Sequence, residues 1–366
     1  MKAAVLREQK KPLVIEDVEI AKPGPDEVLI RTVASGVCHS DLHFVDGHYP
    51  CILPAILGHE SAGIVEQVGS NVSYVTPGDH VVTILSPFCG ECEYCLSGRM
   101  ALCVQVNPDY ARRKEGEPPR LSVKGEPVFQ FGGLASYAEQ MLVHQRAIAK
   151  IRPDMPLDVA ALVGCAVVTG LGSVFQTAKI EPGSTVAVFG CGGIGLMCIN
   201  AAYIAGAARI IAIDMEGAKL NLAKGFGATD VINAKDGDVV KKLQEMTGGG
   251  VHYSFEAIGL KATAEQAFKS LRHGGTATII GMIPVGTNVE IHGPDPYWRA
   301  RKLQGAFMGS NRFRIDMPRF IEYYMQGRLK LNELISDRIG LSDINDALTN
   351  LRTGKGSVAR QVIMFN

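Results

Sequence analysis

Four cysteines lie within sixteen consecutive residues, FCGECEYCLSGRMALC, at positions 88–103. Cysteines separated by two residues on a glycine-containing turn aim their sulfurs at one centre, which suits a tetrahedral metal cage better than paired disulfides. We therefore predict a structural zinc ion bound by Cys89, Cys92, Cys95 and Cys103. A cage of four thiolates has no open coordination position, so this metal would hold a lobe together and perform no chemistry. Two disulfides, which need an oxidising compartment, or a redox Cys-x-x-Cys pair are the alternatives.

A second group of residues that can bind metal precedes the cage. The segments GVCHSDLHFVDG and ILGHESAGIVEQVG have the pattern of turns and strands, and they contain Cys38, His43, His59 and Glu60. Taken singly, each of these is as ordinary as a core or surface residue. Their clustering in a chain that also carries a nucleotide-binding motif favours a second metal site.

The glycines of GCGGIG form a third chemical motif. They follow the apolar run TVAVF and open an apolar helix, and they are Gly190, Gly192, Gly193 and Gly195. In this context they indicate a dinucleotide site, because glycines let the backbone approach a pyrophosphate whose charge the helix N-terminus offsets. Asp214, at the end of the next strand, would bind ribose hydroxyls and repel a 2′-phosphate, and residues 215–218 include no arginine. We predict NAD(H) in preference to NADP(H); a glycine-rich turn without a ligand is the alternative.

Two different patterns of apolar residues predict the elements that position the metal-binding and nucleotide-binding residues. Up to about residue 150, β-branched runs such as EVLIRTVAS, SAGIVEQVG and HVVTIL alternate with turns, which predicts a mostly β, barrel-like lobe. From Thr185, strands such as TVAVFG and ARIIAID alternate with helices such as AKLNLAKGFG, which predicts a parallel sheet. We expect a long surface loop at the polar residues 104–130. Near the end of the chain we expect a helix at PRFIEYYMQGRL and a strand at VARQVIMF.

Composition limits the class of protein. A length of 366 residues suggests two domains, and 46% apolar with 20% charged residues is ordinary for a globular protein. Lysine plus arginine equals aspartate plus glutamate, at 37 each, which argues against nucleic acid or an anionic membrane as partner. The uncharged residues 183–208 could span a bilayer by length, but their glycines indicate a buried strand, turn and helix. Nine cysteines and a charged N-terminus favour a reducing cytoplasm.

Taken together, Cys38, the GHE of residues 58–60, the four-cysteine lobe, GCGGIG and Asp214 resemble the medium-chain zinc-dependent alcohol dehydrogenase family over nearly the whole chain. The resemblance implies an α/β protein with two domains. A GroES-like β-barrel catalytic domain would comprise residues 1–166 and 308–366, with the structural zinc lobe at 88–104. A Rossmann domain with a doubly wound parallel sheet would comprise residues 167–307.

The resemblance also implies a catalytic zinc ion held by Cys38, His59 and Cys165. Two thiolates and one imidazole leave one position open for water or substrate, the arrangement known for alcohol dehydrogenases. Glu60 would stand near this metal, and Asp41 would orient the imidazole of His59. With the cage, this makes two zinc ions per subunit.

Proton transfer, cofactor contacts and the substrate pocket are likewise implied by the resemblance. Ser40 would accept the proton of the alcohol, which would reach His43 near the surface through the nicotinamide ribose. Further cofactor contacts are His39, Thr169, Lys219 and Arg360. An apolar, partly aromatic pocket would favour alkyl, allylic or aryl primary alcohols, and its predicted lining is Tyr49, Leu85, Phe131, Met282 and Phe307.

Three other classes of protein compete with an NAD-dependent alcohol dehydrogenase. A zinc-free quinone reductase would lack Cys38, His59 and the cage, and a zinc-containing nucleic-acid binder would need neither neutral charge nor a nucleotide site. A non-catalytic NAD-binding redox sensor on the same fold remains the alternative. The long loop after Cys103 resembles that of longer, often dimeric members of the family, which implies a homodimer formed by edge strands of the nucleotide domains, with a tetramer as the second choice.

Overall fold

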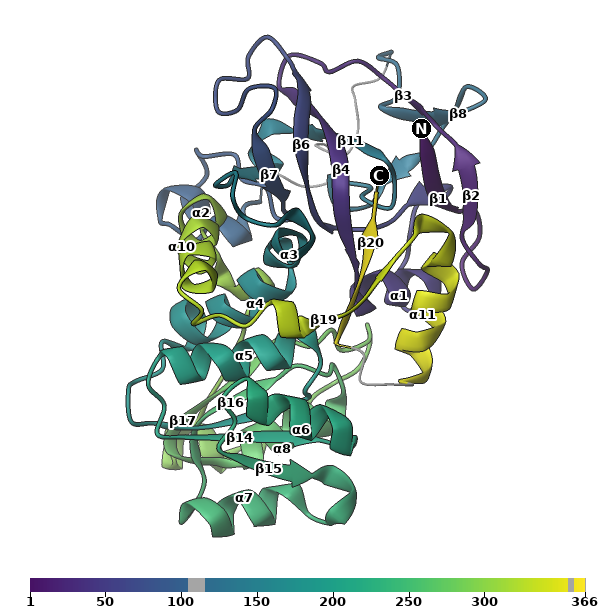
Figure 1. Cartoon of the computed structure of the whole chain (residues 1–366). Coiled ribbons are helices and arrows are strands. Elements are labelled where there is room, and N and C mark those ends of the chain that lie inside the picture. Colours follow the sequence, from purple (N-terminus) through teal and green to yellow (C-terminus); the bar gives the residue numbers. More distant parts are fainter. Residues whose placement is uncertain (105–115, 355–358, 366) are drawn as a thin grey trace. The chain divides into compact units, whose positions relative to one another are not determined.

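The computed structural model describes residues 1–104, 116–354 and 359–365. The chain divides into two compact units. Unit 1 comprises Met1–Cys165, Arg312–Met325 and Leu331–Asn366, and unit 2 comprises Ala166–Asn311 and Gln326–Lys330. Figure 1 shows both, coloured along the sequence.

The main sheet of unit 1 is built on one long strand, β4 (Glu27–Val37), which is rich in β-branched residues and buried along most of its length. The C-terminal strand β20 (Arg360–Met364) pairs antiparallel with it, so the end of the chain lies beside the residues that lead to Cys38 (Figure 1). The sheet order is β12 (Ile148–Lys150), β7 (His80–Thr83), β6 (Glu60–Val68), β4, β20 and β19 (Ile335–Ile339), and β11 (Gln140–His144) also pairs with β4.

Two smaller sheets and five α-helices complete the described part of unit 1. One sheet has the order β10 (Phe129–Gln130), β5 (Ala55–Ile56), β1 (Lys2–Leu6) and β2 (Val14–Asp17). The other has the order β3 (Glu19–Ile20), β8 (Leu121–Val123) and β9 (Glu126–Pro127). The helices are α1 (His39–Val45), α2 (Glu93–Leu96), α3 (Leu157–Ala161), α10 (Phe313–Met325) and α11 (Ile344–Thr353). Since α1 starts directly after β4, Cys38 stands at the junction of the two elements.

Unit 2 is a parallel sheet with helices between its strands. The sheet order is β15 (Asp230–Asn233), β14 (Arg209–Asp214), β13 (Thr185–Phe189), β16 (Val251–Glu256), β17 (Leu271–Ile279) and β18 (Lys302–Gly305), and every adjacent pair is parallel. The helices are α4 (Ala166–Gly172), continued by the π-helical turn η6 (Ser173–Ala178), α5 (Gly193–Ile204), α6 (Gly217–Gly225), α7 (Val239–Thr247), α8 (Lys261–Lys269) and α9 (Pro294–Trp298). Because β13 lies between β14 and β16, the strand order reverses there, which is where Rossmann folds bind nucleotides.

The predicted parallel sheet and mostly β lobe are confirmed, and so are the strands at 27–35, 61–69 and 185–190 to within a few residues. The loop prediction for residues 104–130 is wrong in part. Residues 105–115 lie outside the described part of the chain, but β8, β9 and β10 occupy most of 121–130. Leu121 and Val123 are buried, and Leu121 stands opposite Ile20 of β3, so alternate apolar residues outweigh the polar composition.

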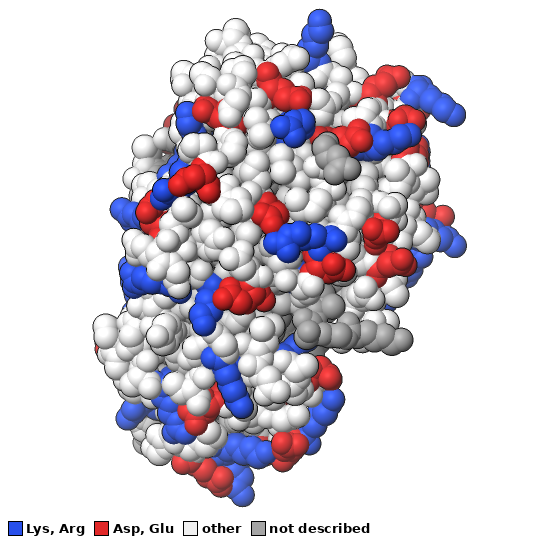
Figure 2. Space-filling view, viewed as in Figure 1, with Lys and Arg blue, Asp and Glu red and all other residues white. Residues whose placement is uncertain are grey.

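The uncharged residues 183–208 form β13, a turn and α5, as predicted. Among the described residues, no single helix is both long and apolar enough to cross a membrane, although the bent pair Leu157–Gly164 and Ala166–Ala178 passes by length and composition. Most residues of that pair are buried in the folded chain. Lysine and arginine are interspersed with aspartate and glutamate over the face shown in Figure 2, in keeping with a formal net charge of zero.

Candidate functional site

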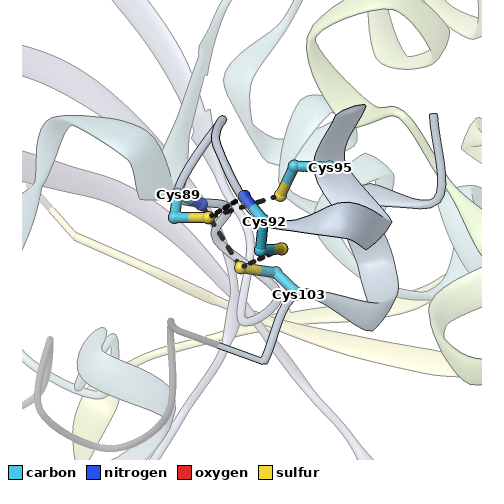
Figure 3. A group of neighbouring side chains, drawn as sticks. All are labelled: Cys89, Cys92, Cys95 and Cys103. Carbon is cyan, nitrogen blue, oxygen red and sulfur yellow. Dashed lines mark hydrogen bonds between the residues drawn. The ribbon is translucent and has the colours of Figure 1, made fainter. Parts of the chain in front are cut away.

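The four cysteines of residues 88–103 converge within unit 1 (Figure 3). Their sulfur atoms all lie within 4.8 Å of one another. Cys89 Sγ lies 3.7 Å from Cys95 Sγ, and Cys92 Sγ lies 3.8 Å from Cys103 Sγ. A tetrahedral zinc ion with Zn–S bonds of about 2.3 Å would separate its sulfurs by about 3.8 Å, so the set fits zinc. All four are free thiols, which excludes the alternative of two disulfides.

Backbone N–H groups favour the ionised form of this cage. Those of Glu91 and Cys92 donate to Cys89 Sγ at 3.4 and 3.2 Å, and that of Cys89 donates to Cys103 Sγ at 3.3 Å. Such hydrogen bonds, led by the one from Cys95, lower the pKa of Cys92 to about 6. Burial raises the pKa of Cys95 to about 12. Since zinc binds thiolates, a cage that already favours one needs to release fewer protons on binding.

Cys38, His59 and Cys165 form a second convergent group. Their ligand atoms lie within 4.8 Å of one another, and all three side chains are buried. In the antiparallel pair of β4 and β6, Gly36 stands opposite Glu60, so the sheet brings Cys38 next to His59. Cys165 follows the 3-10 turn Leu162–Gly164 and reaches the group from a different part of unit 1.

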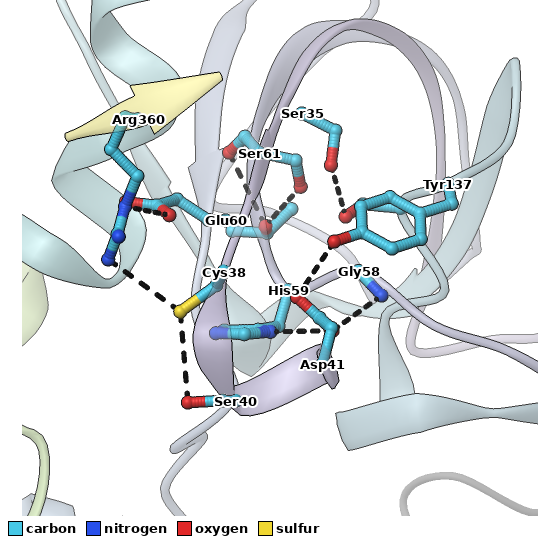
Figure 4. A network of polar contacts seen from close by, with 12 residues as sticks. Ser35, Cys38, Ser40, Asp41, Gly58, His59, Glu60, Ser61, Tyr137 and Arg360 are labelled. Atoms are coloured by element: carbon cyan, nitrogen blue, oxygen red, sulfur yellow. Dashed lines mark hydrogen bonds and ion pairs between the residues drawn. The ribbon is translucent and has the colours of Figure 1, made fainter. Parts of the chain in front are cut away.

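The chemistry of this second group fits a metal ion. The hydrogen bond from Cys165 lowers the pKa of Cys38 well below its usual range, and the same contact, with burial, raises the pKa of Cys165. Buried His59 Nε2 has no hydrogen-bond partner among the described residues and points toward Cys38 (Figure 4). A buried nitrogen without a partner is costly. Two thiols and such a nitrogen are the donor set of a zinc ion with an open fourth position.

Asp41 holds the imidazole of His59 in place (Figure 4). Its fully buried carboxylate accepts hydrogen bonds from His59 Nδ1 at 3.1 Å, Gly58 N at 3.0 Å and Tyr137 Oη at 2.8 Å. Gly58 has φ +89°, and a Cβ there would lie 2.6 Å from Ser136 Oγ, so this turn requires glycine. Burial lowers the pKa of His59, but the carboxylate of Asp41 more than offsets this and leaves that pKa well above its usual value. The network fixes Nε2 as the free nitrogen.

Glu60 and Arg360 form a buried ion pair beside Cys38. Arg360 Nε lies 3.1 Å from Glu60 Oε2, and its Nη2 lies 3.6 Å from Cys38 Sγ. Their side chains are 3% and 0% exposed, so Arg360 is not a solvated surface charge. Burial lowers the pKa of Arg360, but the negative charges of Glu60 and of the thiolates raise it above its ordinary value. The contact of Arg360 with the cofactor stays a prediction.

Three further candidate residues of unit 1, His39, Ser40 and His43, lie on α1. Ser40 Oγ lies 3.7 Å from Cys38 Sγ. His43 is half-buried, with its Nδ1 3.2 Å from His48 Nδ1, and His39 is exposed. Three residues apart on one helix, Ser40 and His43 share a face.

Two of the predicted pocket residues, Tyr49 and Phe131, belong to a chain of neighbouring aromatic rings that reaches His59. The ring of Phe131 lies 5.7 Å from that of His59 and 4.5 Å from that of Phe44, which in turn lies 5.7 Å from Tyr49. Leu85 is partly buried and packs against the hydrophobic cluster that includes Leu134. Met282 and Phe307 belong to unit 2, where Phe307 is 55% exposed. The pocket therefore stays a prediction.

In unit 2 the predicted glycines form the turn between β13 and α5. Gly190 has φ +93°, and a Cβ on Gly195 would lie 1.8 Å from Gly190 O, so helix and strand meet only through glycine. A Cβ on Gly192 would meet nothing within 4 Å, which leaves open space at the helix N-terminus. Asp214, at the end of β14, accepts hydrogen bonds from Cys191 N at 2.8 Å and Glu216 N at 3.0 Å. The open space and the helix N-terminus at this turn fit a pyrophosphate, whose binding here stays a prediction.

The remaining two cofactor candidates also lie in unit 2. Lys219 is partly exposed on α6, and Thr169 is buried on α4 with its Oγ1 3.8 Å from Met308 Sδ. Their contacts with a cofactor stay predictions. The sequence reasoning missed Tyr137, the phenol that donates to Asp41, and no local pattern around it signals that role.

Two protein-family patterns match the chain. Residues 24–154 match the alcohol dehydrogenase GroES-like domain, and residues 193–323 match the zinc-binding dehydrogenase domain. The chain belongs to the medium-chain zinc-dependent alcohol dehydrogenase family. The predicted fold class, a GroES-like domain with a Rossmann sheet, is thereby confirmed, and the chain is an oxidoreductase. The family match, the cysteine cluster and a structural neighbour solved with NADP support zinc and a nicotinamide cofactor.

Individual relatives cover almost the whole chain. It is 41% identical to the alcohol dehydrogenase class-3 of Pisum sativum over 364 residues, which are 97% of this chain and 95% of the relative. The crystal structure of a benzyl alcohol dehydrogenase from Acinetobacter calcoaceticus has a TM-score of 0.91 and 31% identity, covering 100% of this chain and 99% of that one. A zinc-binding dehydrogenase from Sinorhizobium meliloti 1021, solved with NADP bound, has a TM-score of 0.82 and 28% identity, covering 100% and 99%.

Proposed function

We propose that this protein is an NAD-dependent zinc alcohol dehydrogenase that interconverts primary alcohols and aldehydes. The observation that carries the proposal is the buried convergence of Cys38, Cys165 and the unpartnered Nε2 of His59. Relatives named alcohol dehydrogenase class-3 and benzyl alcohol dehydrogenase support the reaction type. The aromatic rings near His59 support aryl, allylic or alkyl alcohols as the substrate class.

Two zinc ions and one NAD(H) per subunit are part of this proposal. A zinc ion at Cys38, His59 and Cys165 would supply Lewis acidity that makes an alcohol easier to ionise, and the nicotinamide would accept hydride. The zinc ion at Cys89, Cys92, Cys95 and Cys103 would only hold its lobe together. Asp41 keeps the tautomer of His59 fixed, and Arg360 with Glu60 balances the charge next to Cys38.

The proton path in the proposed reaction uses α1. Ser40 Oγ accepts the hydroxyl proton as it gives up its own, and that proton is passed on to His43, which is on the same face of the helix and partly exposed and releases it to water. Without Ser40 the proton has no acceptor at this position. Replacing Ser40 with Ala is expected to lower kcat by about 10² or more.

Cofactor preference follows from Asp214. Its carboxylate ends β14, and each of its oxygens accepts one backbone N–H, leaving lone pairs for ribose hydroxyls. A 2′-phosphate would meet this negative charge, and residues 215–218 include no arginine to offset it. Because one structural relative was solved with NADP, the ratio of kcat/KM for NAD+ and NADP+ is the direct test. Equal values of kcat/KM for NAD+ and NADP+ would refute the preference for NAD+. Lys219, Thr169 and His39 are proposed as further contacts.

A homodimer in a reducing cytoplasm completes the proposal. β18 is one of the two edge strands of the parallel sheet, and exposed apolar side chains gather at and before it: Tyr297, Trp298 and Leu303. An open edge with such residues favours pairing with a second copy of the chain. In each copy, residues 167–307 would form the nucleotide domain, and residues 1–166 with 308–366 would form the catalytic domain. The chain has nine cysteines, an odd number, which supports a reducing compartment. Light scattering would measure the mass of the protein in solution, and a mass of one chain would contradict the homodimer.

One experiment tests the proposed activity. The purified protein is assayed for NADH formation with benzyl alcohol, geraniol, hexanol and ethanol, and its zinc content is measured. Two zinc ions per chain with turnover of at least one alcohol is the expected result. Zinc and NADH binding without turnover on any alcohol or aldehyde would contradict the proposal and favour an NAD-binding sensor.

A further inference from the structure

A second histidine stands next to the one assigned to proton release. His48 follows α1 by three residues, and its backbone N–H donates to His43 O at 2.9 Å, which holds the two residues together. The two Nδ1 atoms lie 3.2 Å apart, and the ring centroids 5.4 Å apart. His43 is half-buried and His48 is exposed. This pair was not part of the sequence reasoning.

Two imidazole nitrogens at hydrogen-bond distance must carry one proton between them. A neutral imidazole has one N–H and one lone pair, so one ring donates from Nδ1 and the other accepts at Nδ1. If His43 is the donor, its own lone pair is on Nε2, which is then the nitrogen that can accept a proton. If His48 becomes an imidazolium, both of its nitrogens are donors and it can no longer accept from His43.

We propose that His48 is a positioning residue for His43: neutral His48 accepts the Nδ1–H of His43, keeps Nε2 of His43 as the proton acceptor, and loses this role when it is protonated. This inference rests on the proposed proton path. In chemical terms His43 forms a new Nε2–H bond and becomes an imidazolium, whose Nδ1–H is already directed at His48. The proton leaves from His43 to water directly or through His48, and no other group is oxidised or reduced.

The surroundings of His43 agree with this role. Burial lowers the pKa of His43, and the neighbouring His48 lowers it further, whereas Cys38 and Asp46 raise it. The carboxylate of Asp46 is itself paired with Arg352 of α11 at 2.5 Å. The ring of Tyr49 lies 6.1 Å away, and the side chain of Lys10 lies next to Gly47. His43 is therefore neutral, and ready to accept, near neutral pH.

Two substitutions separate hydrogen bonding from titration. His48→Asn places an amide oxygen where Nδ1 stands, so it still accepts the proton of His43 but does not titrate. His48→Leu has similar bulk and neither property. His273→Asn, which removes an exposed histidine of unit 2, is the matched control. Tautomers are read from long-range ¹⁵N–¹H spectra of histidine-labelled protein, without substrate. Proton release is read with a pH indicator after rapid mixing with NAD+ and an alcohol.

The expected tautomer result is an Nδ1–H form of His43 in wild type, His48→Asn and the control, which is lost in His48→Leu. The rate of proton release should have an inflection in wild type at the pH where the His48 resonance titrates. That inflection should be absent in His48→Asn, and the rate in His48→Leu should be about tenfold lower at all pH values.

Failure of the inference differs from failure of the proposed function. A His43 tautomer that is the same in all four proteins, or a wild-type pH profile in both His48 variants, would overturn the role of His48 even in an active enzyme. An inactive wild type would instead refute the proposed reaction, and the tautomer spectra would still decide whether His48 directs His43.

Discussion

Replacing Asp41 with Asn would test whether a buried charge tunes His59 for metal binding. Asp41 accepts three hydrogen bonds, from His59, Gly58 and Tyr137. An amide can keep all three contacts, because its oxygen can accept from His59 and Gly58 while its NH₂ group donates to the rotatable hydroxyl of Tyr137. Alanine would instead strand three buried donors at about 1–3 kcal/mol each, a large part of a stability of about 5–15 kcal/mol. Asp41→Asn therefore removes the charge and little else.

Loss of the charge makes His59 a weaker ligand. Changes of this kind next to a metal-binding histidine cost about 10–100-fold in affinity, or about 1.4–2.8 kcal/mol. The assay mixes the zinc-loaded protein with a chromogenic chelator in excess and follows zinc release. The phase from Cys38, His59 and Cys165 should become faster, whereas the phase from the four-cysteine cage is an internal control.

A matched control is Tyr137→Phe, which removes one donor and keeps the charge, so the release of zinc should change far less. If Asp41→Asn retains zinc at this site as long as wild type does, while both proteins are folded by circular dichroism, the electrostatic argument is refuted. Equal acceleration of both phases would mean that the substitution loosens the whole unit, and this would also refute it.

Three further predictions concern other contacts. Arg360→Met leaves the buried carboxylate of Glu60 without its cation and should lower the free energy of unfolding by about 3–5 kcal/mol in urea titrations; an unchanged midpoint would contradict the ion pair. Gly192→Ala should fold normally but bind NADH more weakly in fluorescence titrations, whereas Gly195→Ala should lower the melting temperature as well, because its Cβ would lie 1.8 Å from a backbone oxygen; normal NADH binding by Gly192→Ala would refute the proposed cradle. The hydrogen bond from Arg209 lowers the pKa of Asp230 in the folded protein. The ion pair therefore stabilises the fold above the unfolded pKa of an aspartate, about 3.9, and this stabilisation is lost as the pH falls through the lower folded pKa. Asp230→Asn should destabilise the protein by up to ~1 kcal/mol at neutral pH, and the difference in urea midpoint between the variant and wild type should disappear in acid. A difference that does not depend on pH would show that the charge of this carboxylate is not responsible.

Much of the fold could be predicted from local patterns. Alternation of strands and helices after Thr185 was enough to predict the parallel sheet, because the central strands β13 and β14 are apolar runs that are buried over most of their length. The short strands within 121–130 were missed since each has only two or three residues, and the first of them, β8, pairs with Glu19–Ile20, a partner a hundred residues away. Local composition cannot reveal such a partner.

The candidate sites also differ in whether their residues are close in sequence or meet only in the folded chain. The cage of Cys89, Cys92, Cys95 and Cys103 was predicted by spacing, because its ligands are close in sequence and the turn itself aims them. Cys165 entered only through resemblance, since no spacing links it to Cys38. The pairing of Arg360 with Glu60 and the bond from Tyr137 to Asp41 were not predicted at all.

What the sequence determined by itself is chemistry confined to short segments: the cage, the glycine turn before α5, and Asp214 at the end of a strand. There the covalent chain fixes the distances between groups. Only the tertiary structure decided which distant groups meet. Antiparallel pairing of β4 with β6 and β20 brings Cys38, His59 and Arg360 together, and burial then makes each of them depend on its neighbours, because a charge removed from water needs a partner.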